Sequence, residues 1–435
     1  MKLDKLWLAG CGAFSVLAAG MPMKSVAQAQ TLPNATSPES VGFSSERLKR
    51  LDTEMAGIVS RGEVKGMATM LVRHGKIVSV KTYGARAEGQ PMTRDTIFRL
   101  ASMSKPVTGV ALMILFEEGR WRLDDPITKF IPEFAKLQVA TGVDKNGQVI
   151  LEPMKRPPTM RELMSHRAGF GYGMSPNSPG DRIFVQKAPL QAHSLKEMID
   201  RMAQAPLLYQ PGEHFSYSAG VDVEGYIIEK LSGETFGQFL QERLFAPLKM
   251  ADTGFYVPSS KLPRLAAMYA TDPATGQLKS GTFGRNPTEP PALESGGGGL
   301  FSTLDDYSRF AQMLANKGEL DGVRILAPST VELMQSNSFP TPLPPDYVHI
   351  LPWMFSDNMG FGLNMQVAVN PRAAGRPEGP GTLSWNGATG VWWWADPAND
   401  VVFLGMIQNS YRAGPRGYSD LADQLVYQAL VQPNK

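Results

Sequence analysis

The sequence predicts an α/β fold in which a sheet domain is built from both ends of the chain and a mostly helical domain is inserted between them. Strand-like runs rich in β-branched and aromatic residues occur near both ends, whereas the middle of the chain has helical periodicity and long loops. The 435 residues are 43% hydrophobic and 19% charged, which is typical of a globular protein with a well-buried core.

The first elements of the predicted sheet domain lie before residue 90. Ser44 or Ser45 can cap a helix whose apolar residues recur at helical spacing, namely Leu48, Leu51, Met55 and Ile58. Residues 67–72 and 76–83 then favour two strands, which His74 and Gly75 join as a hairpin.

The end of the chain is β-rich as well. Residues 382–385, 391–395 and 401–407 have strand-like composition, and the turn-forming stretch 396–400 separates the last two runs. An amphipathic helix over 421–431 is expected to close the chain.

The middle of the chain favours helices and long loops. The stretches with helical periodicity are 160–165, 195–203, 221–231 and 236–244. Two Gly/Pro-rich stretches, 139–158 and 169–193, are expected to be loops that wall a site. We therefore expect a sheet domain of residues 30–125 and 293–435, and a mostly helical inserted domain of residues 126–292.

Residues 1–29 have the three parts of a secretory signal peptide. Lys2 and Lys5 begin it, residues 6–21 are apolar, and Ala27 and Ala29 form a cleavage site of small residues. An uncleaved anchor is the alternative. Cys11 is the only cysteine, so the mature protein would have none, which fits export to a bacterial periplasm and excludes thiol catalysis and thiolate metal sites.

The charge of the chain gives no reason to bind nucleic acid. Lys and Arg total 43 against 41 Asp and Glu, and 40 of each remain if residues 1–29 are removed. Because a protein near zero net charge is not attracted to polyanions, nucleic-acid binding is excluded and no stable membrane partner is expected.

Ser102 and Lys105 are the first residues that could carry chemistry. Pro106 is tolerated in a helix only in its first turn, and an apolar periodic run follows it. The serine and the lysine thus lie at a helix N-terminus on one face, where the amine can reach the hydroxyl and the helix end favours an alkoxide. About one such match arises by chance in a chain of this composition, so an N-cap serine followed by a solvated lysine is the alternative.

Signals of other hydrolases are missing from the sequence. It contains no Gly-x-Ser-x-Gly elbow and no His-Glu-x-x-His motif. Gly296 to Gly299 are not followed by Lys-Ser/Thr, so they form no phosphate loop. For His166 and His214 we expect structural roles. No metal or cofactor is implied.

Residues 98–134 resemble the nucleophile segment of the serine β-lactamase and penicillin-binding-protein superfamily, especially its esterase branch, the family VIII carboxylesterases. Four further segments resemble the family in the same order: 211–218, 245–256, 293–313 and 381–390. The resemblance implies a β-lactamase/DD-peptidase-like fold, with an antiparallel sheet, flanking helices and an inserted helical domain.

The resemblance also implies roles for particular residues. Ser102 and Lys105 match the nucleophile and its lysine, and Tyr217 matches the tyrosine of the family's Tyr-x-Asn element. Ser102 and Ala388 would supply the backbone N–H groups of the oxyanion hole. The strand motif Trp385-Asn386-Gly387 matches Lys-Thr-Gly of lactamases and the usual Trp-Gly-Gly of these esterases, and is expected to bind substrate.

Two departures from the lactamase pattern favour a neutral ester as the substrate. Ala219 stands where lactamases have the Asn that grips an amide side chain, and Trp385 removes a cation suited to a substrate carboxylate. Asn386 stands where these esterases usually have Gly, so the resemblance does not determine the shape of the pocket beside this strand.

The expected function is hydrolysis of small carboxylic esters, with short acyl chains preferred, through an acyl-enzyme on Ser102. A β-lactam hydrolase or D-amino-acid peptidase is one alternative, and a non-catalytic binding or sensor protein of the same fold is another. The sequence leaves open the natural ester, the oligomeric state and whether Lys105 or Tyr217 is the base.

Overall fold

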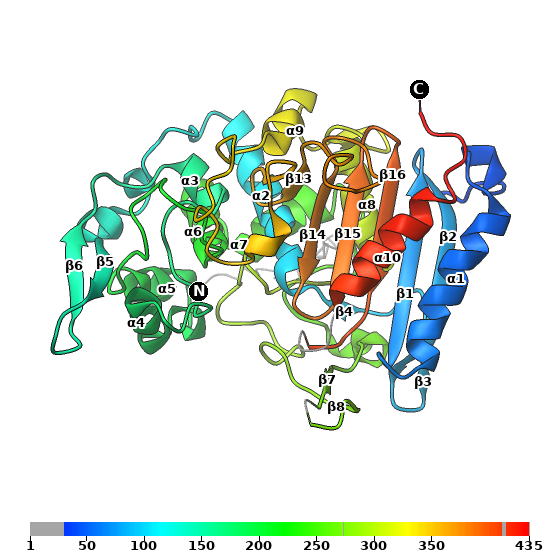
Figure 1. The fold of residues 1–435 in the computed structure, drawn as a ribbon, viewed down its shortest axis with the longest axis horizontal. Coiled ribbons are helices and arrows are strands. Elements are labelled where there is room, and N and C mark those ends of the chain that lie inside the picture. The colour runs from blue at the N-terminus through cyan, green and yellow to red at the C-terminus, as the bar shows by residue number, and fades with distance from the viewer. Residues whose placement is uncertain (1–29, 273, 411–414, 435) are drawn as a thin grey trace, which may run out of the picture.

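The computed structural model describes residues 30–272, 274–410 and 415–434, so the expected signal peptide 1–29 lies outside the described residues. Its centre is an eight-stranded antiparallel sheet with the strand order β12-β13-β14-β15-β16-β1-β2-β3 (Figure 1). The bounds of these strands are β1 Gly66–Arg73, β2 Lys76–Ala87, β3 Gln90–Pro91, β12 Met359–Phe361, β13 Gln366–Ala368, β14 Leu383–Gly387, β15 Val391–Asp396 and β16 Val401–Met406.

The first and last strands of the chain meet in the middle of this sheet. β1 pairs with β16, with Ala68 opposite Met406 and Arg73 opposite Val401, and pairs with β2 on its other edge. The prediction of an antiparallel sheet built from both ends of the chain is therefore confirmed.

Helices cover both faces of the sheet. α1 (Ser45–Ser60) and α10 (Pro415–Tyr427) lie on one face, in front of the strands in Figure 1, and α8 (Leu304–Ala315) lies on the other. The side chains of β15 alternate between them, because Trp392 and Trp394 join the core beneath α1 and α10, whereas the Trp393 ring lies 5.7 Å from that of Tyr307 in α8.

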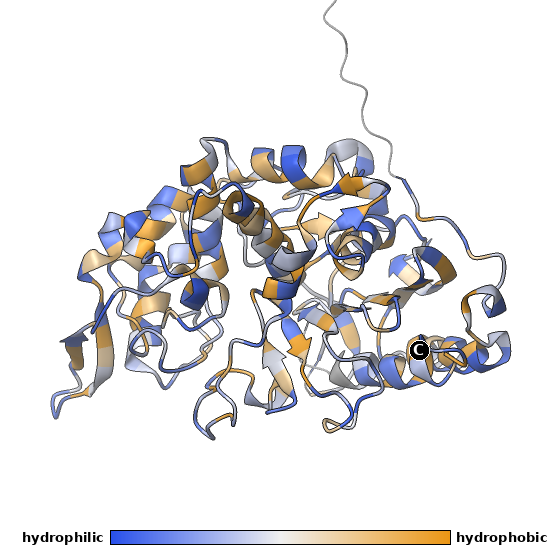
Figure 2. Ribbon diagram, turned by 90° about the horizontal axis from the view of Figure 1, so that it is seen from above, coloured by the Kyte–Doolittle hydropathy of each residue, from blue (hydrophilic) through white to orange (hydrophobic). Residues whose placement is uncertain are grey.

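The segment 126–292 contributes none of its described residues to the large sheet, and most of its elements lie at the opposite end of the molecule (Figure 1). Its helices are α3 Met160–Met164, α4 Pro179–Lys187, α5 Leu195–Met202, α6 Gly220–Ser232 and α7 Phe236–Leu240. α2 (Ser104–Glu117) packs against α6 and so links the two parts. Many helices are banded blue and orange in Figure 2, because one face of each is apolar.

Both stretches expected to be loops contain regular structure. Residues 139–158 form a hairpin of β5 (Gln138–Val143) and β6 (Val149–Pro153), whose turn is fixed because Asp144 accepts hydrogen bonds from the backbone N–H groups of residues 146 and 148. The stretch 169–193 contains α4, which Ser178 caps by accepting a hydrogen bond from the Asp181 N–H.

Other boundaries also differ from those expected. The last helix ends at Tyr427 rather than at residue 431, and β12 and β13 were not expected. The remaining elements are short and lie outside the large sheet: β4 Phe98–Arg99 with β9 Phe301–Ser302, β7 Tyr269–Thr271 with β8 Leu278–Ser280, β10 Glu319–Leu320 with β11 Val323–Arg324, and α9 Pro328–Gln335.

Candidate active site

Ser102 lies in a single 3-10 turn, Ala101–Met103, immediately before α2. Ala101 has a φ of 46°, in the left-handed region that residues other than glycine rarely adopt. Its two neighbours in the turn are buried, whereas Ser102 itself is half-buried and accessible. The turn is held from behind, because the Tyr307 hydroxyl donates a 2.9 Å hydrogen bond to the carbonyl oxygen of Met103. A strained, well-supported turn that presents one accessible hydroxyl suits a nucleophile.

Lys105, the second residue of α2, is fully buried beside Ser102. Its Nζ donates hydrogen bonds to the carbonyl oxygen of Gly297 at 2.7 Å, to the Tyr172 hydroxyl at 3.3 Å and to Ser102 Oγ at 3.4 Å. The solvated lysine that the sequence left as an alternative is therefore contradicted by its burial.

Tyr217 lies in the segment before α6, and its side chain lies beside Lys105. The Nζ of Lys105 lies 4.5 Å from the centre of the Tyr217 ring, and the rings of Tyr172 and Tyr217 meet edge to face at 5.5 Å. The Tyr217 hydroxyl is buried without a hydrogen-bond partner among the described residues. Tyr217, which is far from Ser102 and Lys105 in the sequence, is thus brought together with them in one site.

Charge in this site is distributed between the lysine and the phenols. Burial lowers the pKa of Lys105, but the Tyr172 and Tyr217 phenol groups outweigh burial and hold it above its usual value. Burial raises the pKa of Tyr172 to about 12, against the opposing effect of Lys105. Lys105 and Tyr172 are therefore coupled, since the ammonium form of the lysine and the phenolate form of the tyrosine favour one another.

The glycine-rich run before β9 holds the lysine in place. Asp222 accepts hydrogen bonds from the Ser295 hydroxyl at 2.5 Å and from the Gly297 N–H at 3.2 Å. The Gly297 carbonyl in turn accepts the shortest hydrogen bond of Lys105. A Cβ atom at Gly297 would lie 2.6 Å from Asp222 Oδ2, so only glycine allows this approach. Residues 296–299 therefore position the lysine.

His166 packs behind Tyr217. The two ring centres are 4.7 Å apart, and His166 Nδ1 lies 3.1 Å from Ser218 Oγ and accepts a hydrogen bond from the Ser218 N–H. Burial lowers the pKa of His166 well below its usual value, so the ring is neutral. His214, by contrast, contacts Tyr209 and the carbonyl oxygen of Asp346.

The end of β14 lies against the segment that carries Ser102. A Cβ atom at Gly387 would lie 2.2 Å from the carbonyl oxygen of Leu100, which shows how closely the two backbones pass. Two residues later, the Thr389 hydroxyl donates a 2.7 Å hydrogen bond to the carbonyl oxygen of Arg99. Ala388 lies between these contacts, beside the turn of Ser102.

Two neighbours in β14 face opposite sides of the sheet. The Trp385 ring lies 5.7 Å from the Tyr217 ring and 5.4 Å from the Phe361 ring, so it forms part of the candidate active site. Asn386 pairs across the strands with Trp392, on the face of α1 and α10. The prediction that Asn386 contacts substrate is not supported by this placement, because adjacent strand residues point to opposite faces.

Sequence reasoning missed two side chains of the site. Tyr172 contacts Lys105 directly, and Asp222 holds the Gly297 loop. Asp222 lies five residues after Tyr217, whereas Tyr172 belongs to no local motif of the sequence.

Within the part of the chain that the structure describes, no group of three or more His, Cys, Asp or Glu side chains could hold a metal ion. No helix among these residues is long and apolar enough to cross a membrane.

The chain is similar to proteins from several bacteria. It is 37% identical over 361 residues to an uncharacterized protein of Mycobacterium tuberculosis, covering 81% of this chain and 88% of that one. It is 30% identical over 389 residues to Esterase EstB of Burkholderia gladioli, covering 84% and 92%.

Among solved structures, the fold is similar to EstCE1, described as a hydrolase with promiscuous acyltransferase activity. The TM-score is 0.73 at 25% sequence identity, and the match covers 88% of this chain and 99% of that one. The model of the Beta-lactamase family matches residues 50–428. The chain therefore belongs to the Beta-lactamase family, with esterases among its relatives, as its motifs predicted.

Proposed function

We propose that this protein is a serine carboxylesterase that hydrolyses small carboxylic esters with short acyl chains through an acyl-enzyme on Ser102. The observation that carries the proposal is the buried Lys105, whose Nζ lies 3.4 Å from the accessible Ser102 Oγ and 4.5 Å from the Tyr217 ring.

The proposed reaction has two steps. Ser102 Oγ attacks the ester carbonyl, and its proton passes to the coupled pair of Lys105 and Tyr217. The pair returns that proton to the leaving alcohol as the C–O bond breaks. Water then attacks the acyl-enzyme by the same route and releases the acid. The backbone N–H groups of Ser102 and Ala388 stabilise the oxyanion in both steps.

The surroundings of the serine support an uncharged substrate. Ala219 is fully buried and offers no side-chain amide, and Trp385 places an indole where a lactamase lysine would meet a carboxylate. Two relatives carry the names Esterase EstB and Lovastatin esterase, which agrees with ester chemistry. A β-lactam hydrolase or a D-amino-acid peptidase remains the rival within the family, and a non-catalytic binding protein the rival outside it.

We further propose that the protein is exported to a bacterial periplasm or secreted after removal of residues 1–29. The basic start, the apolar run and the small residues of this segment support the proposal. Fractionation of cells followed by determination of the mature N-terminus tests it. An intact Met1 in the cytosolic fraction would contradict it.

One experiment separates the candidate functions. The purified protein is labelled with a fluorophosphonate and then assayed on p-nitrophenyl butyrate and benzylpenicillin. We expect labelling of Ser102, turnover of the ester and little turnover of the penicillin. Absence of both labelling and turnover would favour the binding protein, and faster turnover of the penicillin would favour the lactamase.

A further inference from the structure

Three oxygen atoms surround the Nζ atom of Lys105. They are the carbonyl oxygen of Gly297 at 2.7 Å, the Tyr172 hydroxyl at 3.3 Å and Ser102 Oγ at 3.4 Å. The side chain of Lys105 is fully buried, so these oxygen atoms determine the directions in which its N–H groups point. In the proposed reaction only Ser102 Oγ attacks the substrate, so the other two oxygens hold the amine while it reacts.

A lysine that removes the proton of a serine must first be neutral, with two N–H groups and one lone pair on its amine. The Gly297 carbonyl can only accept a hydrogen bond, and the Tyr172 hydroxyl has a lone pair that accepts another. Once the two N–H groups point to these two oxygens, the lone pair points to the third neighbour, Ser102 Oγ. Without the Tyr172 hydroxyl, the amine could turn its lone pair away from the serine.

The side chain of Asp181 holds the loop that carries Tyr172. Asp181 is buried, and its Oδ1 accepts hydrogen bonds from the N–H groups of Tyr172 and Gly173, each at 2.8 Å. Its Oδ2 accepts a hydrogen bond from the Ser175 N–H at 2.6 Å. A Cβ atom at Gly171 would lie 2.5 Å from Asp181 Oδ1, so glycine is needed for this close approach. One buried carboxyl group thus fixes the backbone around the tyrosine.

The loop is also attached to the segment that carries Tyr217. The Ala219 N–H donates a 3.1 Å hydrogen bond to the carbonyl oxygen of Gly171. The rings of Tyr172 and Tyr217 meet edge to face at 5.5 Å. The backbone and the ring of Tyr172 are therefore both held, with the hydroxyl at Lys105, and a side chain held in this way is suited to orient another group.

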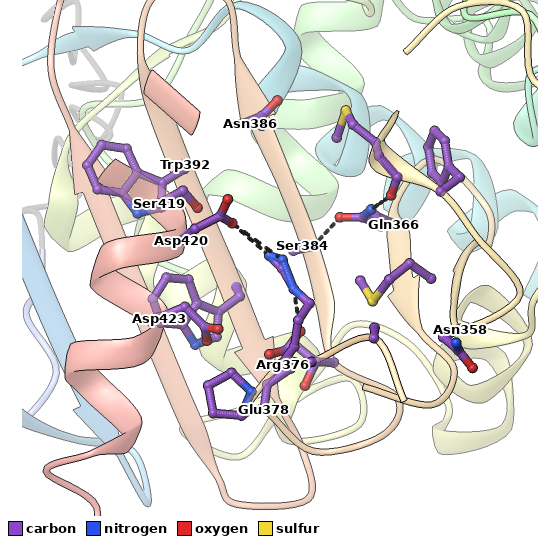
Figure 3. A pocket seen from close by; sticks show the side chains of 18 of the residues that line it. Asn358, Gln366, Arg376, Glu378, Ser384, Asn386, Trp392, Ser419, Asp420 and Asp423 are labelled. Carbon is purple, nitrogen blue, oxygen red and sulfur yellow. Dashed lines mark hydrogen bonds and ion pairs between the residues drawn. The ribbon is translucent and has the colours of Figure 1, made fainter. Parts of the chain in front are cut away.

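The other face of β14 takes no part in this arrangement. A cavity of about 650 Å³ lies there, which Ser384 of β14 and Asp420 of α10 line (Figure 3). Neither Tyr172 nor Lys105 is among the residues that line it. A change in this cavity therefore leaves the lysine in place and can serve as a control.

We propose that Tyr172 is a positioning residue, whose hydroxyl accepts a hydrogen bond from Lys105 and so directs the lone pair of the amine at the proton of Ser102. Asp181 supports this role by holding the tyrosine loop. The role rests on the proposed function, since it concerns the same serine. In the first step the O–H bond of Ser102 breaks and its proton forms a third N–H bond on Lys105. The electron pair of Oγ forms the bond to the ester carbonyl carbon. The lysine then has three N–H groups, which match its three observed hydrogen bonds.

The phenol of Tyr172 also affects the charge of the lysine. Burial lowers the pKa of Lys105, and the phenol groups of Tyr172 and Tyr217 oppose this effect. The other titratable groups that face the lysine are the His166 ring and the carboxyl groups of Asp222 and Glu224. Removal of the Tyr172 phenol therefore lowers the pKa of Lys105, since fewer groups then oppose burial.

The rate at which a fluorophosphonate labels Ser102 tests this role, because the reagent needs an activated serine but no ester-binding site. In Tyr172→Phe we expect labelling to slow by roughly tenfold or more, since phenylalanine keeps the ring but accepts no hydrogen bond. This variant should fold, because Tyr172 is only half-buried. The same measurement applies if the protein prefers a β-lactam to an ester.

Kinetics on p-nitrophenyl butyrate separate orientation of the lysine from a loss of packing. In Tyr172→Phe, kcat should fall by the same factor as the labelling rate, with little change in KM. The rising limb of kcat/KM against pH should move to lower pH, because the lysine loses its proton more readily. A general loosening of the site would lower kcat without moving this limb.

Asp181→Asn tests the support of the tyrosine. Its amide has one accepting oxygen instead of two, so at least one N–H group of the loop loses its acceptor and kcat should fall severalfold. Tyr226→Phe and Asp144→Asn are the matched controls. The Tyr226 hydroxyl makes no hydrogen bond within the described residues, and Asp144 accepts hydrogen bonds from the backbone of a hairpin turn. Both controls should keep the native kcat and pH profile, as should Ser384→Ala in the cavity.

A native labelling rate in Tyr172→Phe would overturn the role of Tyr172. A lowered kcat with an unmoved limb would also overturn it and make the tyrosine a packing residue, and a raised KM at native kcat would make it a substrate contact. If the native protein is neither labelled nor active, the proposed function fails and the role of Tyr172 fails with it. If Asp181→Asn does not fold, Tyr172→Phe decides the result.

Discussion

The hydroxyl of Thr389 donates a 2.7 Å hydrogen bond to the carbonyl oxygen of Arg99, three residues before Ser102. This bond fastens the backbone beyond β14 to the backbone that leads into the nucleophile turn. It would therefore hold the N–H groups of Ser102 and Ala388, which we propose as the oxyanion hole, at a constant separation. An oxyanion hole made from two distant segments depends on such a tie, because its donors must be in place before the reaction begins.

Thr389→Val should lower kcat for an aryl ester by about tenfold with little change in KM, since only the positions of the oxyanion donors change. The fold should survive, because Gln408 Nε2 also donates to the Arg99 carbonyl at 3.2 Å. Steady-state kinetics check this prediction, and Thr389→Ser, which keeps the hydroxyl, should restore the rate. A valine variant with native kcat would show that the tie does not act on the oxyanion hole.

Ser102→Ala should affect the activity of the protein, whereas Ser104→Ala should affect its stability. Ser102→Ala should remove nearly all esterase activity and leave thermal stability unchanged. Ser104 Oγ is buried and accepts a 3.0 Å hydrogen bond from the Leu300 N–H, so its loss should destabilise the protein by about 1–3 kcal/mol. Kinetics and urea unfolding of both variants measure the contrast. Activity near the native level in Ser102→Ala would contradict the mechanism.

Lys105 and Tyr217 should act as a unit. Tyr217→Phe should lower kcat/KM by roughly 10²–10⁴-fold, and Lys105→Ala by at least as much. Lys105 Nζ lies 4.5 Å from the centre of the Tyr217 ring, so each residue acts through the other. The fold-loss of kcat/KM in the double variant should therefore be much smaller than the product of the two single losses. A double-mutant cycle on an aryl ester measures this coupling, and strictly multiplicative losses would show two independent roles.

The kcat/KM for a short-chain aryl ester should exceed that for benzylpenicillin by at least about two powers of ten. The penicillin's amide and carboxylate find no partners at Ala219 and Trp385. The ratio measured on one enzyme preparation checks this prediction. If it folds, the double variant Ala219→Asn/Trp385→Lys should have a smaller ratio of kcat/KM for the ester to kcat/KM for the penicillin. Comparable kcat/KM values for the two substrates in the native protein would favour a lactamase.

Glu224 gives the protein a pH-dependent stability. Burial raises its pKa to about 8, although Asn364 Nδ2 donates to it at 2.5 Å. The folded state thus holds a proton that the unfolded state releases above about pH 4.3. The contribution of this group to stability is complete below about pH 4.3 and is lost as the pH rises to about 8.

Glu224→Gln should flatten the dependence of the unfolding free energy on pH between these values. Urea unfolding at pH 5, 7 and 9 measures it, with the exposed Glu88→Gln as the control. If the unfolding free energy of Glu224→Gln varied with pH as in the native protein, Glu224 would not be the group responsible.

The elements that could be predicted from the sequence are those whose composition is decisive over five residues or more. The apolar run of β16 and the tryptophans of β15 are buried throughout, so their composition identified them. β12 and β13 have three residues each, too few to show alternation, and they form only because β14 offers an edge to β13, which in turn pairs with β12.

The residues of the candidate site likewise divide into those that short motifs identify and those that only tertiary packing brings into place. Ser102, Lys105 and Tyr217 belong to short motifs that the family resemblance identifies. Tyr172 lies in a stretch that composition described as loop, and only the packing of α4 and its neighbours brings the phenol to Lys105. The placement of Asn386 could have been predicted, because it follows Trp385 in a strand and the two cannot face the same side.

The pairing of β1 with β16 has a consequence for how the chain folds. The strand that begins near residue 66 meets a partner that ends at Met406, so the central ladder cannot form until nearly the whole polypeptide has been synthesised. Contacts between such distant segments slow folding, because the long intervening chain must first be brought together. A nascent chain that stops before residue 401 would leave β1 with one open edge, and we expect it to aggregate or be degraded rather than to survive as a smaller enzyme.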